Sequence, residues 1–85
     1  MIVDIAFWDV DDVDALHAAT AVEEWRGIDG LRLKLWIVDR ERGRWGAIML
    51  WDGERPASLP PNRAAELIGR PADHRLTFDV AEVAP

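Results

Sequence analysis

Apolar and other side chains alternate along four stretches of the chain, a period-two pattern typical of β-strands. The clearest alternation lies in residues 31–38, where Leu31, Leu33, Leu35 and Ile37 are separated by residues of other kinds. Turn-forming glycines, prolines and aspartates bound the four stretches. The predicted strands are residues 2–8, 31–38, 45–51 and 74–83.

Helical periodicity appears twice between these strands. Apolar residues recur three to five positions apart after the first strand and predict a helix over about residues 12–26, with Asp11 or Asp12 as its N-cap. A second, shorter helix is predicted at about residues 61–68, because prolines precede it and Gly69 follows it.

The order of the elements, β-α-β-β-α-β, is that of the ferredoxin-like fold. Right-handed crossovers then place both helices on one face of a four-stranded antiparallel sheet, with the strands in the spatial order 4-1-3-2. A length of 85 residues corresponds to one domain. We therefore expect a single α+β ferredoxin-like domain over residues 1–85.

Each predicted strand has one strongly apolar face, and we expect the helices to cover these faces. Their members are Val3, Ile5, Phe7, Leu31, Leu33, Leu35, Ile37, Ile48, Leu50, Leu76, Phe78 and Val80. The opposite face would carry three tryptophans and a methionine, more apolar surface than a soluble monomer leaves exposed. The residues expected to contact a partner there are Asp4, Trp8, Met49, Trp51 and Asp79.

Three kinds of partner could cover that face. RNA-binding domains share this element order, but residues 44–51 lack the aromatic positions of the usual RNA-stacking motif. The net charge of −6 also disfavours a phosphate backbone, so we expect no nucleic-acid partner. A second copy of the chain would give a two-fold homodimer, and a different protein is the remaining alternative.

Composition narrows the chemistry further. The chain has no cysteine, so disulfides and thiolate metal sites are excluded. No apolar run approaches the ~18 residues of a membrane span, and no signal peptide is evident, so we expect a cytoplasmic protein with no membrane association. The acidic residues between positions 9 and 14 match the favourable charge of a helix N-terminus and lack the spacing of a calcium loop, so no metal is predicted.

Lys34, the only lysine, and Trp36 are the strongest site candidates. They lie two positions apart in a strand and therefore on one face. A lysine on a covered face needs a carboxylate or water, and Asp4 or Asp79 could supply the carboxylate. One interpretation is an interface ion pair with tryptophan packing. The other is that Lys34 holds an anionic or carbonyl oxygen of a ligand while Trp36 stacks on it.

Several segments resemble one family. The run 30–36 with its Lys-x-Trp, the glycine at position 43, the run 46–52 and Phe78-Asp79-Val80 resemble the YdhR-type mono-oxygenase-like proteins of the dimeric α/β-barrel superfamily. The second helix of this chain is shorter than is usual in that family.

The resemblance implies a homodimer that binds a small aromatic substrate in an apolar pocket and lets it react with dioxygen without any cofactor. It also implies a pocket between the sheet and the helices, to which His17 and Trp25 would contribute. The catalytic residues stay unassigned. The alternative is a non-catalytic dimer that binds a small ligand or a partner protein.

Overall fold

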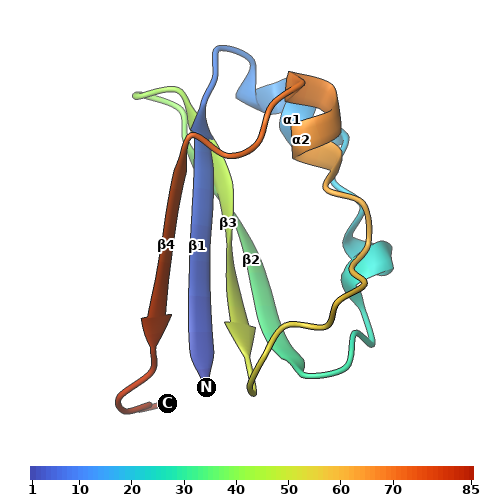
Figure 1. The fold of residues 1–85 in the computed structure, drawn as a ribbon. Helices are drawn as coiled ribbons and strands as arrows, with labels where there is room; N and C mark the ends of the chain where they lie inside the picture. The colour runs from blue at the N-terminus through green and yellow to red at the C-terminus, as the bar shows by residue number, and fades with distance from the viewer.

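The computed structural model describes all 85 residues and contains one four-stranded sheet, two α-helices and one 3-10 helix (Figure 1). The elements are β1 (Ile2–Asp9), α1 (Val13–Ala18), η1 (Val22–Trp25), β2 (Leu31–Asp39), β3 (Arg44–Trp51), α2 (Arg63–Ile68) and β4 (His74–Asp79). The strand order is β2-β3-β1-β4 and every pairing is antiparallel. The predicted strand order and the ferredoxin-like βαββαβ class are therefore confirmed.

Side-chain hydrogen bonds at both ends of α1 limit its length. The side chain of Asp12 caps α1 by accepting a hydrogen bond from the Ala15 amide (3.0 Å). The Thr20 hydroxyl donates to the Leu16 carbonyl (3.2 Å), a bond that competes with continued helix. The single helix expected over residues 12–26 is therefore divided into α1 and η1.

The second helix follows its sequence signals closely. The Asn62 side chain accepts from the Ala65 amide (3.0 Å), and the chain leaves the helix through Gly69 in the left-handed conformation, at φ 86°. Residues 52–62, which connect β3 to α2, have no regular structure and lie beside the helices. We call this segment the strap.

The two faces of the sheet are used in the opposite way to that expected. Both helices, η1 and the strap lie on one side of the sheet (Figure 1), above the face predicted to be open. Four of the expected dimer contacts are buried there within the monomer: Asp4, Trp8, Met49 and Trp51. Only Asp79, in the last position of β4, is exposed. The assignment of those four residues to an open dimer face is therefore wrong.

The size of the helical layer explains this reversal. Each α-helix has six residues, and together they bury only Val13 and Leu16. Trp8 and Trp45 rise from the sheet to pack against these two side chains and form the core cluster. The indole Nε1 of Trp8 also donates to the carbonyl of Arg70 (3.0 Å), which ties the end of α2 to the sheet. Large aromatic side chains thus fill a space that two short helices cannot fill.

The other face of the sheet carries the aliphatic rows and has no layer over it. The strand registers align eight side chains in two rows: Leu35, Ile48, Ile5 and Leu76; and Leu33, Leu50, Val3 and Phe78. We call these eight the open apolar face. The four on the outer strands are about half exposed, from 46% for Leu35 to 53% for Phe78. An apolar surface of this extent is unusual for a monomer.

Candidate functional site

A cavity of about 230 Å³ lies between the sheet and the layer above it. Its floor follows from the strand registers, which align Arg75, Ala6, Ala47 and Trp36 in one row across the sheet. The two central members of this row are alanines, whereas Trp8 pairs with Trp45 in the adjacent row. The small side chains leave the space that the tryptophans fill elsewhere.

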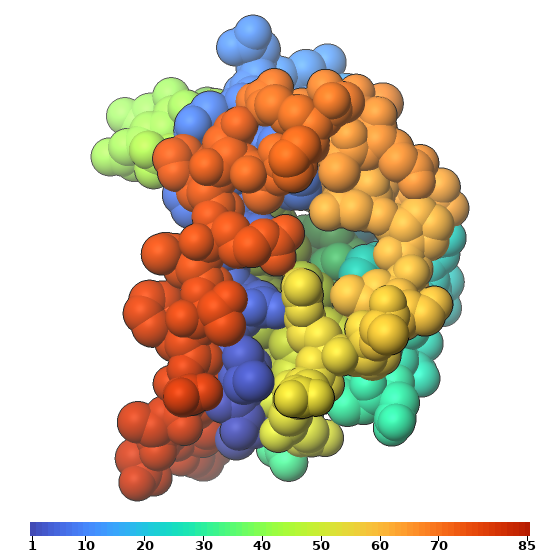
Figure 2. Space-filling model, in the orientation of Figure 1, coloured from blue at the N-terminus to red at the C-terminus, as the bar shows by residue number.

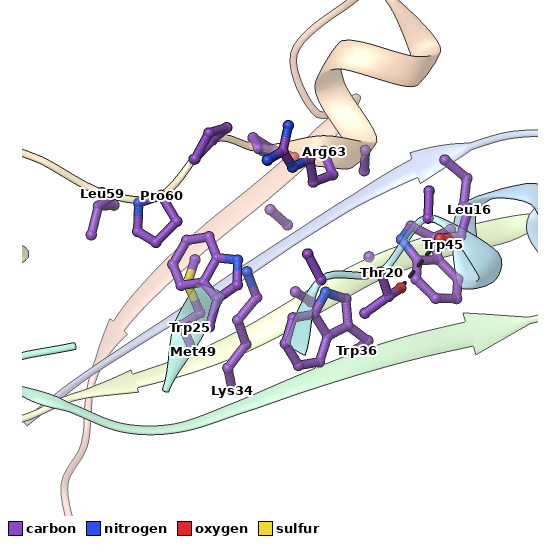
Figure 3. Close-up of a pocket in the computed structure, with 18 of the residues that line it drawn as sticks. Leu16, Thr20, Trp25, Lys34, Trp36, Trp45, Met49, Leu59, Pro60 and Arg63 are labelled. Atoms are coloured by element: carbon purple, nitrogen blue, oxygen red, sulfur yellow. Dashed lines mark hydrogen bonds between the residues drawn. The ribbon is translucent and has the colours of Figure 1, made fainter. Parts of the chain in front are cut away.

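The roof comes from two parts of the chain far apart in the sequence, residues 20–25 and the strap. Thr20 lies beside α1, Trp25 comes from η1, and Leu59 and Pro60 come from the strap (Figure 3). Arg63, in the first turn of α2, completes the upper wall. Figure 2 shows the surface hollowed between β4, in orange-red, and the strap, in yellow to gold.

Two ion pairs hold the roof in place: one joins α2 to η1, and the other joins the strap to the sheet. Arg63 donates to both carboxylate oxygens of Glu24 (2.7 and 3.0 Å), and this hydrogen bonding holds the pKa of Glu24 below its ordinary value. Arg55 of the strap lies 3.3 Å from Oδ2 of Asp4, whose other oxygen accepts from the Thr77 hydroxyl (2.7 Å). Asp4 is only 4% exposed, so the strap is anchored on a buried charge.

Lys34 extends from the middle of β2 into the cavity, between Trp25 and Trp36 (Figure 3). Its Nζ lies 3.2 Å from the ring centroid of Trp25 and 4.8 Å from that of Trp36. No carboxylate pairs with it, because Asp4 is held by Arg55 and Thr77. Within the chain, the predicted pairing of Lys34 with Asp4 or Asp79 is therefore wrong, and two indole faces take the place of the carboxylate.

Burial and the indoles act on the Lys34 ammonium in opposite directions. Burial lowers the pKa of Lys34 from its ordinary 10.5 to about 8, because the charged form loses hydration. The indole faces attract the charged form. With a pKa of about 8, a substantial neutral fraction of Lys34 exists near pH 8.

The charge of the cavity wall is opposite to that of the whole protein. The chain carries a net charge of −6, yet its cavity is lined by Lys34, Arg55, Arg63 and Arg75 and by no aspartate or glutamate. Two of these cations are already paired with carboxylates. Lys34 and Arg75 are not in any ion pair of the structure, so the cavity offers unneutralised positive charge beside aromatic surface.

Lys34 and Trp36, which were predicted on the sheet face away from the helices, lie with Trp25 in the cavity between the sheet and the helices. His17, also predicted for this pocket, is the exception, because it follows Leu16 by one position on α1 and so turns away from the buried stripe. It is exposed, and its ring lies against Trp45 at 5.8 Å between centroids. Ala6, Ala47 and every contribution from the strap were not predicted from the sequence.

The acidic residues near α1 have separate partners. Asp12 caps the helix, Asp14 pairs with Arg40, and Asp9 lies 2.9 Å from Nε2 of His74. No group of three or more potential ligands is arranged to hold a metal ion. None of the helices has the length and apolar character needed to cross a membrane.

A scan against protein-family models and a search of curated proteins find no match to this chain. The class is therefore defined by the structure: an α+β protein of ferredoxin-like topology with a cationic, tryptophan-walled cavity between its sheet and its helical layer. The resemblance to the YdhR-type family stays a prediction.

Proposed function

We propose that this protein binds a small aromatic anion, such as a phenolate, in the cavity between sheet and helices. The observation that carries the proposal is Lys34, an ammonium without a carboxylate partner that lies between two indole rings. An anionic oxygen would complete the charge pairing of Lys34, and the indoles would stack against the ring that bears it.

The volume of the cavity limits the ligand. A cavity of about 150 Å³ in another protein holds benzene, so about 230 Å³ suits one aromatic ring with small substituents. Polycyclic phenols and quinols are too large for this space. The ligand class that fits both size and charge is the one-ring phenolate or aromatic carboxylate.

For a phenol, the proposed reaction is mono-oxygenation without a cofactor. A phenol and dioxygen give a quinone and water, so the substrate supplies all four electrons and one oxygen atom enters the product. The neutral amine of Lys34 would accept the phenol proton, and the resulting ammonium would hold the phenolate while it reacts. The YdhR-type resemblance supports this reaction.

A non-catalytic binding protein is the second candidate, and one observation favours it. Completing a quinone requires removal of a ring proton after oxygen adds, yet Lys34 is the only group lining the cavity whose pKa lies near neutrality. His17, the nearest imidazole along α1, lies outside the cavity. Lys34 would already hold the phenol proton, so the cavity has no second base for the ring proton. It therefore suits binding better than a reaction that removes two protons.

We also propose that two copies associate through the open apolar face. Its eight aliphatic and aromatic side chains form a two-row surface without a covering layer. Burial of a surface like this against an identical one is the simplest way to remove it from water, and a two-fold axis lets each row meet its equivalent. The helical layer and its cavity then face outward on both copies.

Titration with 4-nitrophenol at pH 8, followed by tryptophan fluorescence, tests the binding. We expect a dissociation constant on the order of 10–100 μM, the range that a ligand of this size reaches. Lys34→Met should weaken binding at least tenfold. Arg26→Met, which removes an exposed charge paired only with Glu23, serves as the matched control and should not change it. Equal affinity in all three proteins would overturn the proposal.

Oxygen-18 labelling separates the two candidate functions. Incubation with 4-methoxyphenol under ¹⁸O₂, without reductant or cofactor, should place one labelled oxygen in the product if the protein is an oxygenase. Binding of nitrophenolate without any labelled product would establish the binding protein instead.

A further inference from the structure

We infer that Lys34 is also a covalent capture site for small aromatic aldehydes, through a reversible imine between its Nζ and the carbonyl carbon. The inference rests on the proposed function in one respect only: the cavity must admit a one-ring aromatic compound. It adds a different chemistry, in which the lysine is a nucleophile rather than an anchor.

The placement of the amine carries the inference. Lys34 has the only side-chain primary amine in the chain, and its Nζ lies in a 230 Å³ cavity that can hold the aldehyde beside it. A lysine locked in a hydrogen-bonded ion pair is a poor nucleophile, but Lys34 is in no ion pair and its ammonium lies against the faces of Trp25 and Trp36. Its nitrogen lone pair is therefore free once the proton leaves.

The reaction balances without an oxidant or reductant. The neutral amine attacks the carbonyl carbon, a carbinolamine forms, and loss of water leaves a C=N bond. With the proton retained on nitrogen, the imine carries the same single positive charge as the starting ammonium. The indoles that hold the ammonium can therefore hold the product cation, and the added aromatic ring extends the stacking surface.

Burial favours the neutral form of Lys34. The cavity wall around it also holds Arg55 from the strap, Arg63 from α2 and Arg75 from β4, whereas Asp4 and Glu24 are each bound to one of these arginines. Burial lowers the pKa of Lys34 to about 8. The indoles act in the other direction. At pH 7.5 the neutral fraction of Lys34 thus exceeds that of an ordinary lysine by more than about tenfold.

Reductive trapping tests the inference. The full chain is incubated at pH 7.5 with 4-hydroxybenzaldehyde and sodium cyanoborohydride, which reduces an imine to a stable secondary amine. The expected adduct mass is that of the aldehyde less one oxygen atom, and peptide mapping separates modification of Lys34 from that of the Met1 α-amine. We expect Lys34 to react at least about tenfold faster than the lysine of an unfolded peptide spanning residues 31–38.

Two controls make the outcome specific. Lys34→Arg keeps the positive charge but cannot form the imine, so its only adduct should be on the Met1 amine. Addition of 4-nitrophenolate should slow the labelling of Lys34 and leave that of Met1 unchanged. A rate for Lys34 no greater than that of the peptide would overturn the inference.

The same measurements distinguish this inference from the proposed function. If nitrophenolate binds and Lys34 is not labelled faster than the peptide, the covalent site is wrong and the binding site stands. If Lys34 is labelled rapidly and nitrophenolate neither binds nor protects, the covalent site stands and the anion-binding proposal is wrong.

Discussion

Replacement of Lys34 by methionine should change how the stability of the protein depends on pH. Methionine keeps an unbranched apolar stem of similar length and removes the ammonium. In the folded protein burial lowers the pKa of Lys34 to about 8, while the unfolded chain has the ordinary value of 10.5. The unfolded state therefore binds more protons between these two pH values, so the wild type should gain stability as the pH rises through this window.

The size of the effect follows from the same two values. A fall of the pKa from 10.5 to about 8 corresponds to about 3 kcal/mol of folding free energy. Because Lys34 is only partly buried, solvent screening reduces this to about 1–2 kcal/mol. Below pH 8 the amine is charged in both states and the full cost of burying it is present. Above pH 10.5 it is neutral in both and the cost is gone.

Paired urea denaturations, followed by tryptophan fluorescence at fixed protein concentration from pH 7 to pH 10.5, measure this difference. We expect the free energy of unfolding of Lys34→Met, relative to wild type, to fall by about 1–2 kcal/mol across the range. Lys34→Arg retains its charge throughout and should show no gain with pH. A constant difference between wild type and Lys34→Met would refute the reasoning, because the lysine would then be hydrated as in the unfolded chain.

Three further predictions concern the open face, the cavity floor and the strap. Leu35→Lys should reduce the mass measured by light scattering from that of a dimer to that of a monomer. Val38→Lys, at an equally exposed position whose register pairs it with Trp45, should leave the dimer intact, and a dimer in both variants would exclude the open apolar face as the interface. Ala47→Leu should fill the cavity and abolish nitrophenolate binding at a cost of about 1–3 kcal/mol in stability, and retained affinity would place the ligand elsewhere. Arg55→Met should lower the free energy of unfolding by about 3 kcal/mol in urea titrations, because it leaves the buried carboxylate of Asp4 without its cation, and a loss below about 1 kcal/mol would show that the pair is hydrated.

Local rules were sufficient for the four strands, the second helix and the order of the elements, although the helix expected over residues 12–26 is divided into α1 and η1. The caps at Asp12, Asn62 and Gly69 lie where short-range hydrogen bonding and backbone freedom place them, and such effects depend on neighbouring residues alone. The predicted grouping of Lys34 with Trp36 depended only on the period of a strand and was also correct. The strap was beyond these rules, because it follows no periodic pattern.

Local rules could not show which face of the sheet the helices cover. Alternation shows that two faces differ, and it identifies the buried face only when the other is polar. Here one face carries leucines and isoleucines and the other carries Trp8, Trp36, Trp45 and Trp51, so both are apolar. What decides between them is the volume that two six-residue helices leave unfilled, which is a property of the packed molecule.

The cavity nevertheless has a signal in the sequence, which appears once β1 and β3 are aligned as antiparallel neighbours. In that register Trp8 lies opposite Trp45 and Ala6 opposite Ala47, so large pairs and small pairs alternate along the helix-facing side. Two large side chains together support the helical layer, and two small ones together leave a space that neither neighbour can close. If one alanine lay opposite a tryptophan, the indole would fill the space above the alanine from across the strand pair. Matching by size across the register therefore turns two ordinary residues into the floor of a binding site, and Lys34, one row away on β2, is close enough to reach into it.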